Sequence, residues 1–519
     1  MSHPSAAPPN AWGAADFAVG AALFVVASAF AWTWGWHLAD DSWLMQVTNR
    51  FLYGEILYRN VYLHITPLSI YLLALPAAIF GPQILVLRIE IALIFAAVAI
   101  VACRINEQLG ASRRYPPLLI LSLVVFASPA RLQLVAHYNS LATLFILVAF
   151  SLWLSWRASG RVAFMWGAGA ALGACFAAKQ TCGGYGAIAL AISTIAVVRA
   201  ERWSAGRLFQ LLIRAGAAFV AVALVAILPM IVTGSFFAMI ASTVLGHGTY
   251  LRLAGMPYLK PILSLESVLD NPLSLDSLRY LNAALPYFFP FLVAPLLVAT
   301  FVRSDRRERA LTIAVASFTI ATLAIIYPRA DPEHMLFATP MLLVALAFGW
   351  RRMGWSAQLF RARVLASGAF AITAAAAALM TWSAAKRAVS PNYVSSSIPL
   401  FRGPLIAREI HDSFKRNLAN VSAFPRDGRT FFLGPYASFY YLAAGMHNPS
   451  RYDYPYEVAL RQNGVAEIIA EIQDGKISAV CLDRNGDPQL KPYDLQRYVE
   501  RNMIRLPAPD FCEQYVRPR

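Results

Sequence analysis

Long apolar runs alternate with short polar loops over most of the chain. A helix needs about 20 apolar residues to cross the hydrocarbon core of a bilayer. The runs that come close to this length are residues 14–34, 84–103, 116–132, 139–156, 162–178, 182–199, 214–233, 283–302, 310–327, 335–350 and 364–384. We therefore predict a polytopic α-helical membrane protein with about 11 transmembrane helices.

One further apolar stretch, residues 65–82, is predicted not to cross the membrane. Its sequence, ITPLSIYLLALPAAIFGP, is short, and three prolines interrupt it. Proline removes a backbone donor and kinks or breaks a helix. We interpret this stretch as a re-entrant or surface-lying helix within a long first loop, residues 35–83. A second long loop, residues 234–282, is then expected on the same side of the membrane.

The basic residues support this layout and predict its orientation. Cytoplasmic loops of membrane proteins carry an excess of Lys and Arg. The loops of one side hold Arg104, Arg113, Arg114, Arg157, Arg161, Arg199, Arg202, Arg207, Arg303, Arg306, Arg307, Arg309, Arg351, Arg352, Arg361 and Arg363. The other side, although it includes both long loops, holds Arg50, Arg59, Lys179, Arg252, Lys260, Arg279 and Arg329. We therefore predict a cytoplasmic N-terminus and an extracytoplasmic C-terminus.

The pattern changes after residue 385. The stretch RTFFLGPYASFYYLAAG reads as a strand, a Gly-Pro turn and a helix. VAEIIAEIQDGKISAVCLDRNGD reads as a helix, a turn at Asp474-Gly475, a buried strand and another turn. Such alternation is typical of an α/β unit. We predict a transmembrane domain over residues 1–385 and a small extracytoplasmic α/β domain over residues 386–519.

Composition excludes a soluble protein and a nucleic-acid partner. The chain is 58% hydrophobic and 14% charged, whereas soluble domains carry about 25% charged residues. A net charge of +16 would suggest nucleic-acid binding in a soluble protein, but here the arginines lie in loops that set topology. The five cysteines show no metal-binding spacing. Cys481 and Cys512 can pair if the tail lies outside the cytoplasm.

The unusual polar residues gather on the predicted outer face. Asp40 and Asp41 follow the first span directly, in WHLADDSW. Ionisable residues at membrane depth are costly and often mark a functional pathway, and Arg and Lys suit a phosphate ligand. Each also has a plain structural interpretation: Asp40 could cap the following helix, and Lys179 could extend to the interface. The other candidates on this face are His64, Asn139, Arg252, Lys260, Arg329, Asp331 and His334.

The stretch ADDSWLMQVTNRFLYGEILYRNVYLHITPLSIYLLAL resembles the first outer loop of the GT-C membrane glycosyltransferases. More narrowly, it looks like the bacterial branch related to protein O-mannosyltransferases and to the aminoarabinose and galacturonic acid transferases of lipid A. That family has an acidic pair after the first span and a Pro-containing apolar helix further on. AKQTCGG and YPRADPEHMLFATP resemble later motifs, so the resemblance extends roughly over residues 15–350.

The resemblance implies an inverting glycosyltransferase at the outer face of a bacterial inner membrane. A hydroxyl of a lipid, glycan or protein acceptor attacks a sugar carried on a polyprenyl phosphate, and the lipid phosphate leaves. Such a reaction needs a carboxylate to take the hydroxyl proton and fixed positive charge for the leaving phosphate. Inversion in one step needs a single base.

Residue roles follow from the same resemblance. Asp41 is the first candidate for the base. Asp40 is the alternative, because the family's pair is commonly Asp-Glu with a catalytic first member. Adjacent helix residues point in different directions, so one of the two is expected to face the donor. Candidates for the donor phosphate are Lys179, Arg329, Arg252 and Lys260, and candidates for orienting the substrate are His334, Asp331, Asn139 and His64.

One position departs from the family pattern. Many members carry an acidic residue just after the third span, where this chain has ARLQLVAHYNS with Asn139. An amide cannot act as a base and is a poor ligand for a divalent cation. No cofactor or metal site is therefore predicted, and a divalent metal stays open as an alternative.

A lipid or polysaccharide transporter without bond-making chemistry is the alternative function. It would be expected to show inverted repeats, discontinuous helices and polar residues at mid-bilayer. The sequence has no detectable repeat, and its unusual polar residues gather on one face. Besides membrane lipids, the expected partners are therefore a sugar donor and an acceptor.

Overall fold

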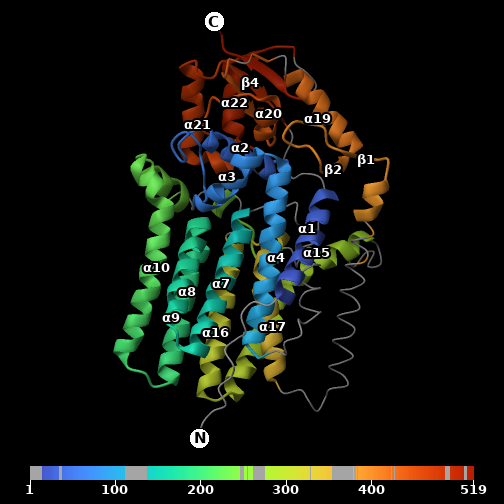
Figure 1. Cartoon of the computed structure of the whole chain (residues 1–519). Coiled ribbons are helices and arrows are strands. Elements are labelled where there is room, and N and C mark those ends of the chain that lie inside the picture. Colours follow the sequence, from blue (N-terminus) through green and yellow to red (C-terminus); the bar gives the residue numbers. More distant parts are fainter. Residues whose placement is uncertain are drawn as a thin grey trace.

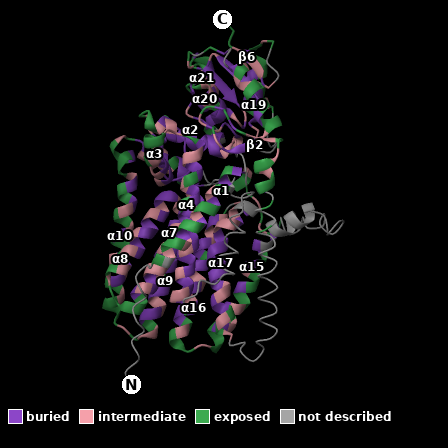
Figure 2. Ribbon diagram, turned by 45° about the vertical axis from the view of Figure 1, so that its right-hand side comes forward, coloured by how far each residue is buried: buried purple, intermediate pink, exposed green. Residues whose placement is uncertain are grey.

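The structure, a computed structural model, describes residues 14–33, 38–110, 137–245, 251–253, 255–260, 275–327, 329–353, 378, 382, 384–421, 424, 425, 427–484, 491–507 and 511–518. These residues form a long helical bundle with an α/β unit at one end (Figure 1). Buried residues fill the interior of both parts (Figure 2).

Long helices joined by short loops make up the bundle. They are α1 (Ala14–Thr33), α4 (Ile84–Gln108), α7 (His137–Ser159), α8 (Ala163–Ala178), α9 (Gln180–Ala200), α10 (Ala205–Val232), α15 (Leu275–Arg303), α16 (Arg306–Leu323) and α17 (Pro332–Arg352). The short 3-10 helix η2 (Ala324–Ile326) continues α16. Each of these long helices matches an apolar run of the sequence.

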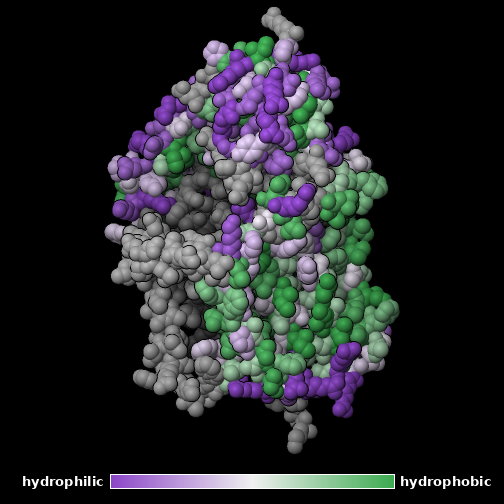
Figure 3. Space-filling view, turned by 180° about the vertical axis from the view of Figure 1, so that it is seen from behind, coloured by the Kyte–Doolittle hydropathy of each residue, from purple (hydrophilic) through white to green (hydrophobic). Residues whose placement is uncertain are grey.

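The predicted polytopic membrane architecture is confirmed. Eight helices of the described part are long and apolar enough to cross a membrane, and α8, with 16 residues, is a shorter apolar helix. On the face shown in Figure 3, hydrophobic side chains cover much of the described bundle surface between two polar ends. The predicted spans 116–132 and 364–384 lie wholly or almost wholly outside the described residues.

Short helices lie at the same end of the bundle as the α/β unit. They are α2 (Asp40–Leu52) and α3 (Leu68–Phe80), with 13 residues each (Figure 1). A 13-residue helix is about 20 Å long, whereas the hydrocarbon core is about 30 Å thick. The stretch predicted not to cross is thus a short helix at the bundle end. After α10 come the short α11 (Phe236–Ile240) and the π-helix η1 (Ala241–Leu245).

Glycines let α8 and α10 approach closely. A Cβ added at Gly169 would stand 2.0 Å from the carbonyl oxygen of Ala215, and one at Gly173 would stand 2.5 Å from that of Phe219. Small residues four positions apart allow such backbone contact between membrane helices. These two positions therefore fix how the helices of this pair pack.

Arginine-bearing helix ends meet at the opposite end of the bundle. Arg307, in the first turn of α16, pairs with Glu201 after α9 at 2.8 Å. Arg352, at the end of α17, pairs with Glu308. The polar rim of that end is visible in Figure 3. The basic loops thus lie at the end of the bundle away from α2, α3 and the α/β unit.

The C-terminal unit contains two sheets and four helices in its described part. Its elements are β1 (Tyr393–Ser395), β2 (Leu405–Ala407), α19 (Arg408–Val421), β3 (Thr430–Leu433), α20 (Ala437–Ala444), α21 (Glu457–Gln473), β4 (Ala479–Leu482), α22 (Tyr493–Asn502), β5 (Ile504–Arg505) and β6 (Glu513–Val516). β1 and β2 form an antiparallel pair, and the larger sheet has the order β3-β4-β6-β5. Only β3 and β4 are parallel within it.

The α/β composition predicted for the tail is confirmed. β3 and α20 match the predicted strand and helix around the Gly-Pro turn, and α21 and β4 match the second prediction. Gly475, in the turn between them, has φ +76°, a conformation that favours glycine. The boundary at 385/386 stays a prediction, because it falls inside the helical residues 384–389.

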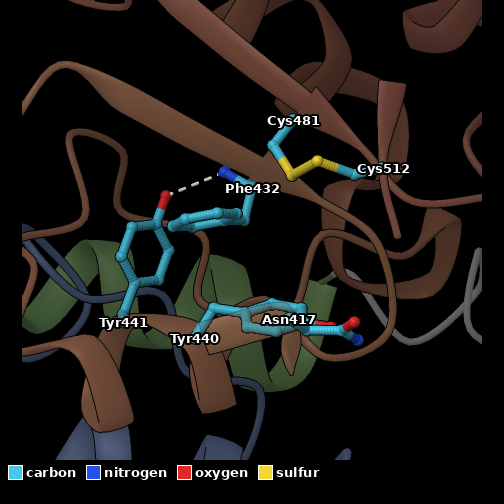
Figure 4. Close-up of a disulfide and its surroundings, with 6 residues drawn as sticks. All are labelled: Asn417, Phe432, Tyr440, Tyr441, Cys481 and Cys512. Carbon is cyan, nitrogen blue, oxygen red and sulfur yellow. Dashed lines mark hydrogen bonds between the residues drawn. A yellow bond between two sulfur atoms is a disulfide. The ribbon is translucent and has the colours of Figure 1, made fainter. Parts of the chain in front are cut away.

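A disulfide joins Cys481 of β4 to Cys512, just before β6 (Figure 4). It lies beside the buried rings of Phe432 and Tyr440. The Tyr441 hydroxyl accepts a hydrogen bond from the Phe432 backbone N–H at 3.0 Å. The disulfide therefore joins the neighbouring strands β4 and β6 next to these aromatic rings.

Replacing both cysteines by serine is expected to lower the free energy of unfolding of the C-terminal unit by about 2–4 kcal/mol, because the bond closes a 31-residue separation. The melting temperature with and without reductant measures this. Reductant should then have no further effect on the Cys481→Ser/Cys512→Ser variant. An equal loss with reductant in that variant would contradict the assignment.

One hydrophobic core is shared by the first loop and the C-terminal unit. It includes Trp43, Leu44 and Val47 of α2 and Ile70 of α3, together with residues of the tail such as Phe439. The backbone N–H of Tyr62 donates to the carbonyl of Arg451 at 2.7 Å. The C-terminal unit is therefore packed directly on the segment that carries the acidic pair.

Candidate active site

The two aspartates at the start of α2 have different surroundings. Asp41 is fully buried and forms an ion pair with Arg88 of α4, 2.5 Å from Nη2 to Oδ2. Arg88 is itself buried at 2% exposure. Asp40 is half-buried. The N-cap position of α2 belongs to Ala39, and no side chain caps the helix there. Asp40 is therefore the first residue of the helix and does not occupy its N-cap position.

A belt of polar contacts continues from this pair across the neighbouring helices. Two residues after Arg88, Glu90 of α4 contacts His137 at the start of α7, 2.8 Å from Oε1 to Nε2. Two residues after His137, the Oδ1 of Asn139 accepts a hydrogen bond from Lys179 at 2.6 Å. Residues two positions apart on α4, and again on α7, thus connect α2 to the junction between α8 and α9.

Lys179 stands where the chain breaks between α8 and α9. Its backbone is extended, with φ −149° and ψ 104°. The ammonium donates to Asn139 and to the backbone carbonyl of Ile325, at 2.6 and 2.8 Å, and lies 5.8 Å from the ring centre of Tyr138. Among the described residues, no carboxylate lies within ion-pair distance of Lys179. This cation is held by neutral oxygens.

Asp331 organises the loop before α17. It caps the helix, accepting from the His334 backbone N–H at 2.8 Å. Its carboxylate also meets the His334 ring at 2.7 Å and Arg329 Nε at 2.6 Å. Burial alone would raise the pKa of Asp331, but hydrogen bonding to His334 and the charge of Arg329 hold it below its ordinary value. The group is therefore an anion at neutral pH.

Part of the second long loop docks on this segment. The backbone N–H of Ala330 donates to the carbonyl of Met256 at 3.2 Å. Tyr258 donates its hydroxyl to the carbonyl of Tyr287, whose own hydroxyl donates to the carbonyl of Ala330, both at 2.7 Å. Elsewhere in this loop Arg252 and Lys260 are exposed. Their role at the donor phosphate stays a prediction.

His64 lies between α2 and the Lys179 region. Its ring stacks on Trp43 of α2, with centroids 4.9 Å apart and an interplanar angle of 13°. Two residues later, the Thr66 hydroxyl donates to the carbonyl of Phe176, near the end of α8, at 3.0 Å. The loop from His64 to Thr66 therefore forms a second connection between the acidic pair and Lys179.

The contacts thus join most of the predicted residues into one region of the bundle end. Two charged residues of this region, Arg88 and Glu90, were not among the sequence candidates. Both lie inside the run 84–103, which reads as an ordinary span. The sequence did contain a signal for them, because an ionisable residue inside an apolar run often marks a functional site. In the described part, no three His, Cys, Asp or Glu side chains converge as metal ligands.

No protein-family model and no significantly similar curated protein matches the sequence. Solved structures do resemble it. ArnT from Cupriavidus metallidurans bound to undecaprenyl phosphate has a TM-score of 0.52 at 13% identity, over 96% of this chain and 97% of that one. AglB from Archaeoglobus fulgidus, in complex with an inhibitory peptide and a dolichol-phosphate, has 0.52 at 12%, over 91% and 69%.

A third similar structure is the arabinofuranosyltransferase AftD from Mycobacteria. Its TM-score is 0.53 at 14% identity, over 99% of this chain and 40% of that one. At these identities the similarity is one of fold, and it extends from the bundle into the C-terminal unit. The fold of this chain is that of the GT-C membrane glycosyltransferases.

Proposed function

We propose that this protein is an inverting glycosyltransferase that moves a sugar from a polyprenyl-phosphate donor to a hydroxyl of a lipid, glycan or protein. The observation that carries the proposal is the environment of Lys179. Its ammonium is held by two neutral oxygens in the same polar belt as the acidic pair. A cation so placed suits an anionic phosphate. The lipid phosphates in the similar ArnT and AglB structures support a donor of this kind.

Asp40 is proposed as the base, in preference to Asp41. Asp41 is fully buried against Arg88, and a carboxylate engaged in a buried ion pair is a weak proton acceptor. Asp40 is half-buried at the first residue of α2, so an acceptor hydroxyl has access to it. Asp41 and Arg88 then fix the start of the helix.

In the proposed reaction, Asp40 takes the proton of the acceptor hydroxyl as its oxygen forms a bond to the anomeric carbon. The bond from that carbon to the phosphate oxygen breaks, and the electron pair leaves with the polyprenyl phosphate. Lys179 stabilises the charge on the leaving phosphate, with Arg329 as a second cation. His334, Asp331, Asn139 and His64 orient the substrates. Attack opposite the leaving group inverts the anomeric configuration.

We place the site at the outer face of a bacterial inner membrane. The basic loops at the opposite bundle end support this orientation, because such loops are retained in the cytoplasm. The disulfide between Cys481 and Cys512 supports it independently, since such bonds persist in oxidising compartments. Both observations favour the same side for the C-terminal unit.

The packing of the bundle favours an enzyme over a transporter. A large apolar core runs through the helices away from the acidic pair, and its buried aromatic residues include Phe150, Trp153, Trp156 and Phe318. Phe150 and Phe318 stack with centroids 4.6 Å apart. A substrate crossing the membrane between these described helices would need a polar path through this core, whereas transfer at one face does not.

Mass spectrometry of lipids and glycans from a deletion strain, compared with the parent strain, tests the proposal. We expect one class of molecule to lose a single sugar and a polyprenyl-phosphate sugar to accumulate. Membranes that contain the protein should then restore the sugar in vitro and release polyprenyl phosphate. An unchanged set of glycoconjugates together with an altered distribution of lipid across the bilayer would favour the transporter.

Lys179→Met is expected to lower kcat/KM about 10²–10³-fold, because it removes a preorganised positive charge at the leaving phosphate. Release of polyprenyl phosphate by purified protein measures this. Lys386→Met, at an exposed lysine near the start of the C-terminal unit, is the matched control and should retain full activity. Equal rates for the two variants would remove Lys179 from the site.

A further inference from the structure

The end of α2 away from the aspartates is fixed by the C-terminal unit. Arg50, in the last turn of α2, is buried at 5% exposure. Its Nη1 donates to both carboxylate oxygens of Asp453 at 2.9 Å and to the carbonyl of Ser450 at 3.0 Å. Nε and Nη2 bind Glu55, and Nη2 also reaches the carbonyl of Asn60 at 2.8 Å. Every nitrogen of the guanidinium group is therefore engaged.

Asp453 is held equally firmly within its own unit. It is buried at 1% exposure. The side-chain amide of Asn448 donates to its Oδ1 at 2.8 Å, and the Ser438 hydroxyl of α20 donates to its backbone carbonyl. Asn448 also accepts from the Ser450 backbone N–H at 3.0 Å. The carboxylate that receives Arg50 is therefore a rigid part of the C-terminal unit.

Two buried ion pairs thus hold α2 at its two ends. Asp41 ties the first turn to Arg88 of α4, and Arg50 ties the last turn to Asp453. A short helix held at both ends has little freedom to tilt. Release of one end would move the residues at the other.

We propose that Arg50 and Asp453 are positioning residues, through which the C-terminal unit sets the orientation of α2 and thus of Asp40. The inference rests on the proposed function, since it takes Asp40 as the base. A buried ion pair is a weak source of stability compared with apolar residues of similar size. A role in orientation accounts better for an arginine whose nitrogens are all engaged. A displacement of about 1 Å can lower a rate about 10²-fold.

Turnover of the full-length protein, with kcat and KM measured separately, provides the first test. Asp453→Asn is expected to lower kcat about 10- to 100-fold. The KM for the donor should be nearly unchanged, because Lys179 lies at the junction of α8 and α9 and not on α2. Glu471→Gln is the matched control. It weakens a partly exposed ion pair with Lys476 in the same unit and should leave both constants unchanged.

A double variant separates orientation from stability. Arg50→Met/Asp453→Leu replaces the buried pair by apolar residues, which commonly restores stability. The Glu55 side chain, which also pairs with Arg50, is 22% exposed, so its carboxylate stays in contact with water. We expect the melting temperature to recover and kcat to stay low. Recovery of both would reduce the pair to a stabilising contact and overturn the inference.

A structural readout makes the test independent of the base assignment. Nitroxide labels at Tyr53→Cys, directly after α2, and at Ile213→Cys on α10 occupy exposed positions. Pulsed electron paramagnetic resonance should give a narrow distribution of distances between the two labels. This distribution should broaden when Asp453→Asn is added. An unchanged distribution, or a changed one with normal kcat, overturns the inference. If Asp40→Asn were active, the proposed base would fail instead, and the label distances would still decide whether the pair orients α2.

Discussion

Asp40→Asn is expected to lower sugar transfer about 10²–10⁴-fold, because the amide cannot take the proton of the acceptor hydroxyl. Binding of the donor should be nearly unchanged, since the lipid phosphate is assigned to Lys179. Transfer measured under donor saturation, on protein that is inserted normally, reports the change in kcat. The loss should be smaller at high pH. There a larger fraction of the acceptor hydroxyl is ionised, and an ionised hydroxyl does not need a base.

Asp494→Asn is the matched control for this variant. Asp494 lies in the first turn of the amphipathic helix α22, as Asp40 does in α2, and is exposed at the surface. Full activity is expected for it. If Asp40→Asn were active while a folded Asp41→Asn protein were inactive, the base would be Asp41, the first candidate of the sequence analysis.

Arg88→Met is expected to lower stability by about 3–5 kcal/mol, because it leaves the buried carboxylate of Asp41 without its cation. Thermal unfolding in detergent measures the change. Asp41→Asn should have a comparable effect, since it leaves the guanidinium group buried without a carboxylate. Both variants are expected to lose folded protein, in contrast to Asp40→Asn.

An exposed pair provides the comparison for this prediction. Arg307→Met breaks the ion pair with Glu201, in which the arginine side chain is 58% exposed. Such surface pairs contribute about 0–1 kcal/mol, so a small change is expected. Asp41→Leu/Arg88→Met should recover most of the stability lost in the single variants. Equal stability for Arg88→Met and Arg307→Met would contradict a structural role for the buried pair.

The membrane layout was predictable because it depends on a strong local signal. Length and apolarity identified the runs that became α4, α7 and α10, and three prolines identified α3 as a short helix. Lys179 and Asn139 were both selected as polar residues at the same membrane face. Their direct contact at 2.6 Å is a consequence of helix packing that no sequence spacing shows.

Other parts of the site depend on contacts that are distant in sequence. Adjacent aspartates on a helix differ in direction by about 100°, so the sequence alone could not decide which one faces α4. Arg88 and Glu90 were not selected, although a charged residue inside an apolar run is itself a signal of function. Arg50 reads as an ordinary loop cation until its partner, 403 residues later, is placed beside it.

That separation has a consequence for biosynthesis. The core beneath α2 is completed by residues such as Phe439, and Asp453 is made later still. During synthesis, α2 is therefore made before its partners in the C-terminal unit. Trp43 and Leu44 lack their final contacts while the remaining spans are inserted. Contacts of such long range also form slowly. On the function proposed above, α2 thus gains this contact only after Asp453 has been made, and a chain truncated before that residue would lack it.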